Sequence, residues 1–481
     1  MSASAQGHPT RVLALLAATQ FAIILDAAIV GVALPSIAAQ LDFDGAGRSW
    51  IVNAYVLPFG GLLVLAGRTG DRVGRRRVFV AGTALFMAAS ALGSLAASAH
   101  VLVLARAGQG LAAAFVSAAA LSLLLATFAP GRGRERALGA WAAVSAAGGA
   151  TGFLLGGVLV AAFGWRSVFA VNVPIALAIV VIAHRLLAPD AARPRRSAFD
   201  LAGAVTLTAG IAGGAFVLVD GGRIGYDSVG VRVLTLMSAA LLVAFWAIER
   251  RAADPLVPPA VLRSAPVVLA NLVAGLITMA VTPMFFFLTL YVQDVLRLGP
   301  LAAGLAILPL SVVIATAASR TPRAVARWGT ERTLAGGLAL LTVGLGLYSR
   351  LPLAAAIVPE VLLPSLVAGV GAGTVWVAAT SAATAGADGT DAGLYAGLVS
   401  TAQQLGSVIG LAVLSVLAAA TTGSTDTPSA MAEGLRAGFL GGAVFTAIAT
   451  LITVTRFVRG PLPRAARPSV STDRTAGDAG T

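Results

Sequence analysis

The sequence predicts an all-α integral membrane protein with 14 transmembrane helices, built as two pseudo-symmetric six-helix bundles with two helices inserted between them. The first observation is composition: 58% of the 481 residues are hydrophobic and 11% are charged, whereas a soluble globular protein has about 25% charged residues. The second is a series of long apolar stretches. The third is an internal repeat that relates the two halves of the chain.

Fourteen stretches meet the length of roughly 20 apolar residues that a bilayer core about 30 Å thick requires. In order along the chain they are 12–34, 49–67, 78–98, 101–126, 137–162, 167–187, 200–219, 230–249, 266–292, 302–319, 333–349, 353–384, 391–420 and 435–456. The first stretch is too long for a cleaved signal peptide and lacks a cleavage site of small residues. We therefore expect it to remain as the first transmembrane helix.

The basic residues, all 33 of them arginine, divide between the two sides of the predicted helices. Twenty-five lie on the side that carries both termini, seven lie on the other side, and Arg106 lies within a helix. Cytoplasmic loops carry the excess of basic residues, so we expect both termini in the cytoplasm of a protein of the inner (plasma) membrane. The net charge of +13 then reflects topology, which argues against nucleic-acid binding.

An internal repeat relates the two halves. The segments GRTGDRVGR (67–75) and SRTPRAVAR (319–327) agree at four of nine positions. At nearly the same offset, Gly139, Gly152 and Gly156 correspond to Gly393, Gly406 and Gly410. We predict an N-terminal bundle over 1–190, a two-helix insertion over 197–250, a C-terminal bundle over 263–458 and a disordered cytoplasmic tail over 459–481. Repeated halves around a central site are typical of alternating-access transporters.

Several classes of protein are excluded by residues that the chain lacks. It has no lysine, so it has no phosphate-binding loop of the form G-x-x-x-x-G-K-[ST] and is not an ATP-driven pump. It has no cysteine and only three histidines, which show no metal-ligand spacing, so we expect neither a disulfide nor a metal site. No connection is long enough for a soluble catalytic domain. We therefore expect no enzyme activity and no cofactor, and an energy source in an ion or substrate gradient.

Asp26 is the ionisable residue placed deepest in the first apolar stretch, roughly 5 Å from its middle. A charge at that depth costs about 3 kcal/mol, and such residues commonly lie on ion or proton pathways. The alternative is a structural aspartate that neighbouring helices satisfy. Ala27, Ala28 and Gly31 offer no hydrogen-bond partner, so we expect the partner to come from another helix.

Arg106 lies about five residues inside the fourth stretch, in LVLARAGQG (102–110). One interpretation is an arginine whose side chain reaches back to the membrane interface. The other is a buried arginine that exchanges partners with a protonatable acid. Gln109 follows on a similar face of the helix and adds a polar neighbour.

Further candidates are small or polar residues within the apolar stretches. Gly148, Gly152 and Gly156 recur every four residues, a spacing that lets another helix approach closely, and Gly406 and Gly410 predict the same packing in the thirteenth stretch. Aromatic residues near the ends of stretches are commonly interface anchors, but a cavity lining is the alternative for a wider polar or aromatic set. That set is Trp50, Asn53, Tyr55, Gln109, Trp141, Asn271, Gln293, Trp376, Gln403 and Gln404.

With these residues identified, the chain resembles the major facilitator superfamily, and specifically its fourteen-helix drug:proton antiporter branch, over residues 12–456. GRTGDRVGRRR (67–77) is similar to the loop signature G-x-L-A-D-R-x-G-R-K at Gly67, Asp71, Arg72, Gly74, Arg75 and Arg76. LARAGQG resembles R-x-x-Q-G at Arg106, Gln109 and Gly110. The fifth stretch resembles the antiporter signature G-x8-G-x3-G-P-x2-G-G at Gly139, Gly148, Gly152, Gly156 and Gly157. LDAAIVGVALP (25–35), WRSVFAVNVPI (165–175), YVQDVLRLGPLAAGLAILP (291–309) and GLVSTAQQLGSVIGLAVL (397–414) resemble further segments of that branch.

The resemblance implies a monomeric proton-coupled exporter of amphipathic drugs or antibiotics, cationic compounds included, which works in the lipid bilayer by alternating access. It implies that Asp26 and Arg106 couple protons, that the loop around Asp71 holds the two halves together at the cytoplasmic side, and that the glycines of the fifth stretch shape a helix at the interface between the halves. Two departures weaken the substrate inference: Phe153 replaces the signature proline, and Ala28 and Gly31 replace polar residues. The alternatives are a dedicated exporter of one endogenous metabolite, a facilitator or importer, and a non-transporting membrane receptor with the same fold.

Overall fold

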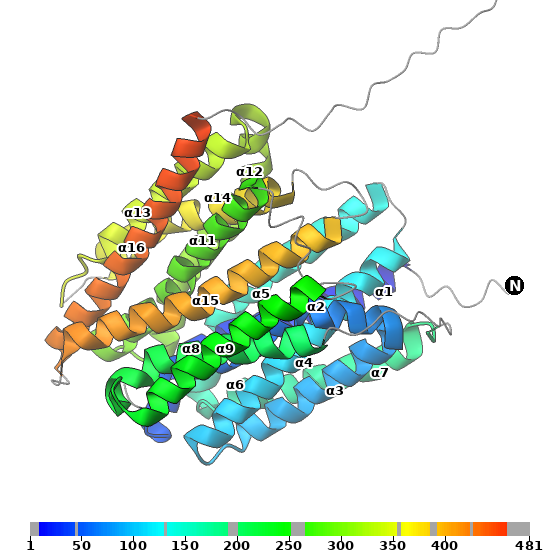
Figure 1. The fold of residues 1–481 in the computed structure, drawn as a ribbon, viewed down its shortest axis with the longest axis horizontal. Helices are drawn as coiled ribbons and strands as arrows, with labels where there is room; N and C mark the ends of the chain where they lie inside the picture. Colours follow the sequence, from blue (N-terminus) through cyan, green and yellow to red (C-terminus); the bar gives the residue numbers. More distant parts are fainter. Residues whose placement is uncertain are drawn as a thin grey trace, which may run out of the picture.

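The structure, a computed structural model, describes residues 9–43, 47–128, 132–190, 201–251, 265–353, 357–384, 392–423 and 427–458. Within these ranges every regular element is a helix, as Figure 1 shows. Ten of the described helical segments are long and apolar enough to cross a membrane. The chain therefore has a multi-pass, all-helical architecture. The predicted tail over 459–481 lies outside the described residues.

The first half of the chain contains α1 (Pro9–Gln40), η1 (Gly47–Ser49), α2 (Trp50–Val73), α3 (Arg75–Ser94), α4 (Ala99–Thr127), α5 (Arg132–Phe163), α6 (Ser167–Ala170) and α7 (Asn172–Leu186). The inserted pair is α8 (Leu201–Ile224) and α9 (Val229–Arg251). The second half contains α11 (Ala265–Leu290), η2 (Tyr291–Val295), α12 (Pro300–Trp328), α13 (Thr330–Tyr348), η3 (Ile357–Leu362), α14 (Leu363–Thr384), α15 (Ala392–Thr422) and α16 (Pro428–Val458). Each predicted stretch overlaps at least one of these elements, and the exact count of 14 crossings stays a prediction.

The predicted arginine-rich loop over 67–77 is not a loop. Helix α2 continues to Val73, Gly74 alone interrupts the helix, and α3 begins at Arg75. The repeat segment 319–327 is likewise helical, because α12 continues to Trp328 before Gly329. Hydropathy marks where the bilayer core ends but not where a helix ends. Arginine is a good helix former, so the helices continue into the arginine-rich segment and the prediction of a loop was wrong. Gly74 and Gly329 have φ values of 115° and 84°, which glycine adopts at little steric cost.

The start of α3 is hydrogen-bonded to residues at the end of α7 and just after it. The two carboxylate oxygens of Asp190 accept hydrogen bonds from the backbone N–H groups of Arg76 and Arg77, each at 3.0 Å. An acidic side chain in this position satisfies free donors of the helix start and interacts favourably with the helix dipole. The Arg76 guanidinium donates to the carbonyl of His184 at 2.8 Å. The side chains of Asp71 and Arg72 lie outside the described residues, so the gating role of this segment stays a prediction.

The helix pairings of the first half recur in the second half (Figure 1). Helix α1 packs on α5 as α11 packs on α15, and α2 packs on α4 as α12 packs on α14. Between the halves, α5 contacts α12 and α15 contacts α2. The inserted helices α8 and α9 pack on each other, and α8 also contacts α2 and α15. The recurrence follows the predicted repeat, while the limits of the domains stay predictions.

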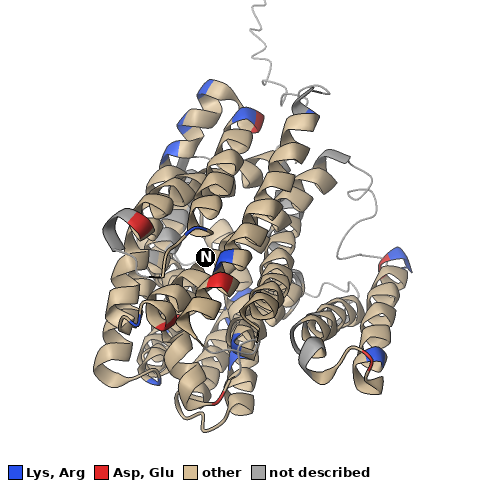
Figure 2. Cartoon of the chain, turned by 90° about the vertical axis from the view of Figure 1, so that its left-hand side faces the viewer, with Lys and Arg blue, Asp and Glu red and all other residues tan. Residues whose placement is uncertain are grey.

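Charged residues occupy short segments of helices that are otherwise uncharged, as Figure 2 shows. The junction of α2 and α3, where Arg75, Arg76 and Arg77 follow one another, lies at what we call the arginine-rich end. The opposite end, with the connection from α1 to α2, is called the arginine-poor end. Few charged groups lie between the ends, so those that do need a physical explanation.

The predicted glycine spacing brings α5 close to the helix that carries Asp26. A methyl group at Gly148 or Gly156 would lie 3.0 Å from a backbone oxygen of α1, and one at Gly152 would lie 2.6 Å from the Ala28 side chain. In the second half, Gly406 and Gly410 abut the α11 backbone at Gly275 and Met279 in the same way. Gly139 lies outside the residues whose side chains are described. The glycines therefore set the distance between paired helices inside each half.

Candidate functional site

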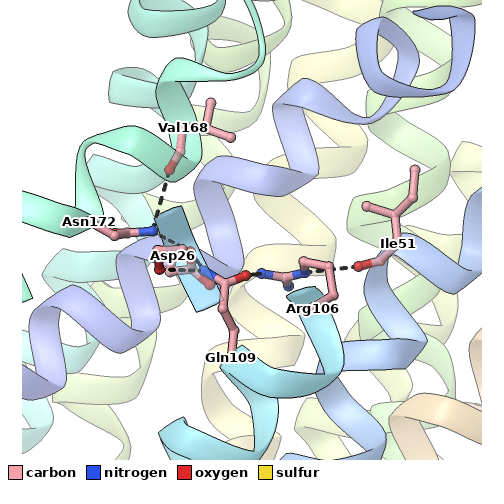
Figure 3. Close-up of polar contacts among 7 residues, drawn as sticks. Asp26, Ile51, Arg106, Gln109, Val168 and Asn172 are labelled. Carbon is pink, nitrogen blue, oxygen red and sulfur yellow. Dashed lines mark hydrogen bonds and ion pairs between the residues drawn. The ribbon is translucent and has the colours of Figure 1, made fainter. Parts of the chain in front are cut away.

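Asp26 of α1 and Arg106 of α4 form a buried ion pair. Nη1 of Arg106 lies 2.9 Å from Oδ2 of Asp26, and Figure 3 shows the two side chains within the helices of the first half. Asp26 is 0% exposed and Arg106 is 1% exposed. The partner of Asp26 thus comes from another helix. The guanidinium does not reach the surface, so the interpretation of Arg106 as reaching back to the interface is wrong.

Amide side chains complete the surroundings of the Asp26 carboxylate. Its Oδ1 accepts a hydrogen bond from Nε2 of Gln109 at 3.1 Å and from Nδ2 of Asn172 at 2.6 Å. Nε2 of Gln109 also donates to Ser90 of α3 at 2.8 Å. Asn172 is the first residue of α7, directly after the break that separates this helix from α6. The carboxylate therefore receives donors from α4 and α7 at once.

Arg106 has partners besides Asp26. Its Nη1 donates to Oε1 of Gln109 at 2.9 Å, and its Nε donates to the carbonyl of Ile51 in α2 at 3.0 Å. Its guanidinium carbon lies 4.3 Å from the centre of the Tyr55 ring, a geometry that stabilises a cation. Gln109 lies three residues after Arg106 and so shares its helix face. Arg106 can therefore lose Asp26 as a partner and still keep an amide, a carbonyl and an aromatic face.

The energetics of this arrangement make it sensitive to the charge on Asp26. Removing one partner of a buried ion pair costs about 3–5 kcal/mol, because the other charge stays buried without compensation. Protonation of Asp26 removes its charge without removing its side chain. The site is therefore suited to convert the arrival of a proton into a change of the contacts between α1, α4 and α7.

Sequence reasoning found part of this site. Asp26, Arg106 and Gln109 meet, and Gln109 and Tyr55, which are also candidates for a substrate cavity, contact the ion pair. Asn172 and Ser90 were missed. The criterion that selected Asn53 and Asn271, an amide inside an apolar stretch, applies equally to Asn172.

The other predicted cavity residues are dispersed. Trp50 lies 6.0 Å from Phe216 of α8 between ring centres, Asn53 is buried with neither amide atom hydrogen-bonded, and Asn271 donates to its own helix at Val267. The rest vary in exposure: Trp141, Gln403 and Gln404 are half-buried, Trp376 is exposed, and Gln293 is buried. Their role in a substrate cavity stays a prediction.

The two halves are held together at the arginine-poor end by polar contacts. Arg48, which precedes α2, forms an ion pair with Asp294 of η2 at 2.7 Å. Next to Asp294, Nε2 of Gln293 donates to the carbonyl of Val32 in α1 at 2.9 Å. Gln293 therefore bridges the halves in this structure.

Phe153 extends the same interface between the halves. Its ring stacks on Phe285 of α11 at 5.1 Å between centres and 12° between planes, and its carbonyl oxygen abuts Gly304 of α12. A methyl group at Gly157 would lie 2.9 Å from the carbonyl oxygen of Pro300. The residue that replaces the signature proline is thus an aromatic contact between the halves at the arginine-poor end.

Weakening the Arg48–Asp294 pair should open this interface more often. We expect Asp294→Asn to raise the rate at which a thiol reagent labels a cysteine introduced by Ala303→Cys, about two- to fivefold, because partly exposed ion pairs contribute about 0.2–1 kcal/mol. Ala303 is 0% exposed, and the chain has no other cysteine. Asp227→Asn, at an exposed position of the described chain, is the control. Equal labelling rates in all three proteins would show that the pair does not hold the interface shut.

The sequence is similar to those of known membrane transporters. The chain matches the Major Facilitator Superfamily over residues 16–411. It is 38% identical to the cephamycin export protein CmcT of Amycolatopsis lactamdurans, with 92% of each chain covered. It is 35% identical to the puromycin resistance protein pur8 of Streptomyces alboniger, covering 94% of this chain and 92% of that protein.

Solved structures share the fold at low sequence identity. The POT family transporter PepTSo superposes with a TM-score of 0.68 at 14% identity, covering 93% of this chain and 98% of that chain. A bacterial homologue of the human lysosomal transporter Spinster, in an inward-facing and unoccupied conformation, gives a TM-score of 0.66 at 16% identity, covering 96% and 100%. The chain therefore belongs to the major facilitator superfamily and is a multi-pass membrane transporter, not an enzyme.

Proposed function

We propose that this protein exports amphipathic antibiotics or drugs, cationic compounds included, in exchange for protons. The observation that carries the proposal is the fully buried ion pair of Asp26 and Arg106, whose arginine has other partners in place. The names of the relatives CmcT and pur8, an export protein and a resistance protein, support an antibiotic as the substrate. A proton gradient would then replace any metal or organic cofactor.

In the proposed cycle, protonation of Asp26 and binding of substrate alternate. A proton that arrives from outside neutralises Asp26 and removes its attraction for Arg106, which keeps its contacts with Ile51, Gln109 and Tyr55. The changed contacts of α1 with α4 and α7 shift the equilibrium between the two arrangements of the halves, one open to each side of the membrane. Release of the proton to the cytoplasm restores the ion pair, and the substrate leaves on the opposite side of the membrane.

The proposed topology has 14 transmembrane helices, with both termini in the cytoplasm, in the plasma (inner) membrane of the cell, as a monomer. The arginine-rich end would then be cytoplasmic, in line with the charge distribution of membrane proteins. The contacts of Arg48 with Asp294 and of Phe153 with Phe285 would close the external side. This supports the assignment of the structure to a state that is shut toward the outside.

A susceptibility panel tests the proposed function. Expressed in an efflux-deficient bacterium, the protein should raise the inhibitory concentration of at least one amphipathic antibiotic, and a protonophore should abolish the protection. The comparison strain carries the empty vector. Protection that survives the protonophore would contradict proton coupling, and no protection against any compound would contradict antibiotic export.

A second candidate function is dedicated export of a single compound. The observation that favours it is the name of the relative CmcT, cephamycin export protein, which mentions a single antibiotic. The breadth of the same panel decides between the two. Protection against one chemical class only would support the dedicated exporter, whereas protection against unrelated amphipathic compounds would support the multidrug exporter.

A further inference from the structure

The hydrogen-bond partners of Asp26 satisfy its ionised form but not its protonated form. Its carboxylate accepts hydrogen bonds from Arg106, Gln109 and Asn172, and each of these groups is a donor. A protonated carboxyl carries an O–H group that itself needs an acceptor. Oε1 of Gln109 is already occupied by Arg106. Oδ1 of Asn172 is buried and accepts no hydrogen bond, so both of its lone pairs are free, whereas Oε1 of Gln109 has one lone pair left.

We propose that Asn172 is a positioning residue whose side-chain amide turns over when Asp26 takes up a proton, so that Oδ1 of Asn172 accepts the hydrogen bond of the new O–H group. The inference rests on the proposed function, in which Asp26 carries the proton. The proton comes from the external side and binds a carboxylate oxygen of Asp26, and no bond of Asn172 is made or broken. Asn172 would thereby satisfy the site in both states of Asp26.

The distance between the two side chains suits both orientations. Nδ2 of Asn172 lies 2.6 Å from Oδ1 of Asp26, and an O–H···O hydrogen bond spans about 2.5–3.0 Å. Rotation about the last side-chain bond of an asparagine exchanges its NH2 group and its oxygen. After the exchange, Oδ1 of Asn172 can therefore accept from the O–H group of Asp26 without movement of the α1 or α7 backbone.

The turned amide gives up the 3.4 Å hydrogen bond from Nδ2 to the carbonyl of Val168, and it finds other acceptors in the cavity that it lines. Asn172 lines a cavity of about 20 Å³ between α1, α3, α4 and α7, together with Thr19 and Thr83. Each threonine hydroxyl donates to a carbonyl of its own helix, Thr19 to Leu15 and Thr83 to Phe79, which leaves lone pairs that can accept. The cavity also has room for about one water molecule. The NH2 group that leaves Asp26 can therefore be hydrogen-bonded there.

Few other groups can respond to pH at this position. The remaining cavity residues on the four helices are apolar: Ala22, Ile23, Phe86, Val116, Ile175, Ala176 and Ile179. The charged groups of the network that contains Asn172 are Asp26 and Arg106, and Tyr55 lies beyond Arg106. A change in the Asn172 amide on acidification would therefore report on Asp26.

Isotope-edited infrared difference spectroscopy tests the proposal directly. The chain contains three asparagines, Asn53, Asn172 and Asn271, so protein labelled with ¹³C at the asparagine side-chain carbonyl gives few bands. In lipid vesicles, acidification should shift one labelled amide band together with the appearance of a protonated carboxyl band. We expect the amide shift to disappear in Asn172→Leu and in Asp26→Ala. It should persist in Asn271→Leu, because the Asn271 amide bonds within its own helix.

The outcomes separate the inference from the function on which it rests. A carboxyl band that Asp26→Ala abolishes, without any shift of an asparagine band, would overturn the inference and leave Asp26 as the proton carrier. Absence of a titrating carboxyl at Asp26 would overturn the proposed function and the inference together. If Asn172→Leu does not fold, Asn53→Leu and Asn271→Leu assign the band by elimination, because the chain contains three asparagines.

Transport kinetics give a second measurement. We expect Asn172→Leu to lower kcat of proton-driven export about fivefold, the effect of one lost hydrogen bond of ordinary strength, with KM for the exported compound unchanged. Thr455→Val, at an exposed position of α16 where the hydroxyl donates within its own helix, is the control, with both parameters expected to stay as in the wild type. A raised KM with an unchanged kcat would place Asn172 in substrate binding and would contradict a positioning role.

Discussion

Replacing Arg106 with leucine should lower the free energy of unfolding by about 3–5 kcal/mol, because the Asp26 carboxylate would stay buried without its counter-charge. The fall in stability should be partly reversed in the double variant Asp26→Leu/Arg106→Leu, since apolar residues of similar volume can replace a buried ion pair at little cost or with a gain. Export activity should be absent from both variants. The measurement is unfolding by titration with a denaturing detergent, with transport assayed on the same preparations.

Arg320 supplies the control for this comparison. It is exposed near the arginine-rich end of α12, so Arg320→Leu should change the free energy of unfolding by less than about 0.5 kcal/mol. A double variant that is less stable than Arg106→Leu alone would show that the two side chains stabilise the protein independently. That result would contradict the buried pair as a coupled unit.

Asp26→Asn should abolish proton-driven export while the protein stays folded. Asparagine has nearly the size of aspartate and keeps a side-chain oxygen that can accept from Arg106, but it binds no proton in the physiological pH range. In membrane vesicles with an imposed pH gradient, we expect transport by Asp26→Asn to fall to the level of wild type treated with a protonophore. Membrane abundance, measured in the same vesicles, should match that of the wild type.

Asp227→Asn is the matched control, because it makes the same chemical change at an exposed position of the described chain. It should keep transport driven by the pH gradient. If Asp26→Asn kept that transport as well, Asp26 would be a structural residue and the proton would have to bind elsewhere.

The fold was predictable because its main determinant is a local property of the sequence. The free energy of transferring apolar side chains into the bilayer follows directly from their hydropathy. The predicted stretches accordingly overlap helices from α1 to α16. The ends of the helices were less predictable. The segment 67–77 and its repeat are helical because a helix does not end where the bilayer core ends.

The site was predictable residue by residue but not as an assembly. Asp26 and Arg106 stand out because a charge in the bilayer core is costly, and each was identified on that ground. Their pairing joins residues that are 80 positions apart in the sequence, and it depends on how α1 packs on α4. The spacing of Gln109 from Arg106 indicated that these two are neighbours, whereas the sequence position of Tyr55 gave no indication that it contacts the ion pair.

The most direct measurement is the release of protons when substrate binds to the purified protein in a weakly buffered solution. If Asp26 exchanges its proton for substrate, wild-type protein should release a proton on binding an exported compound. Asp26→Asn should bind the same compound and release none. Proton release that is equal in the two proteins would contradict a role for Asp26 in coupling.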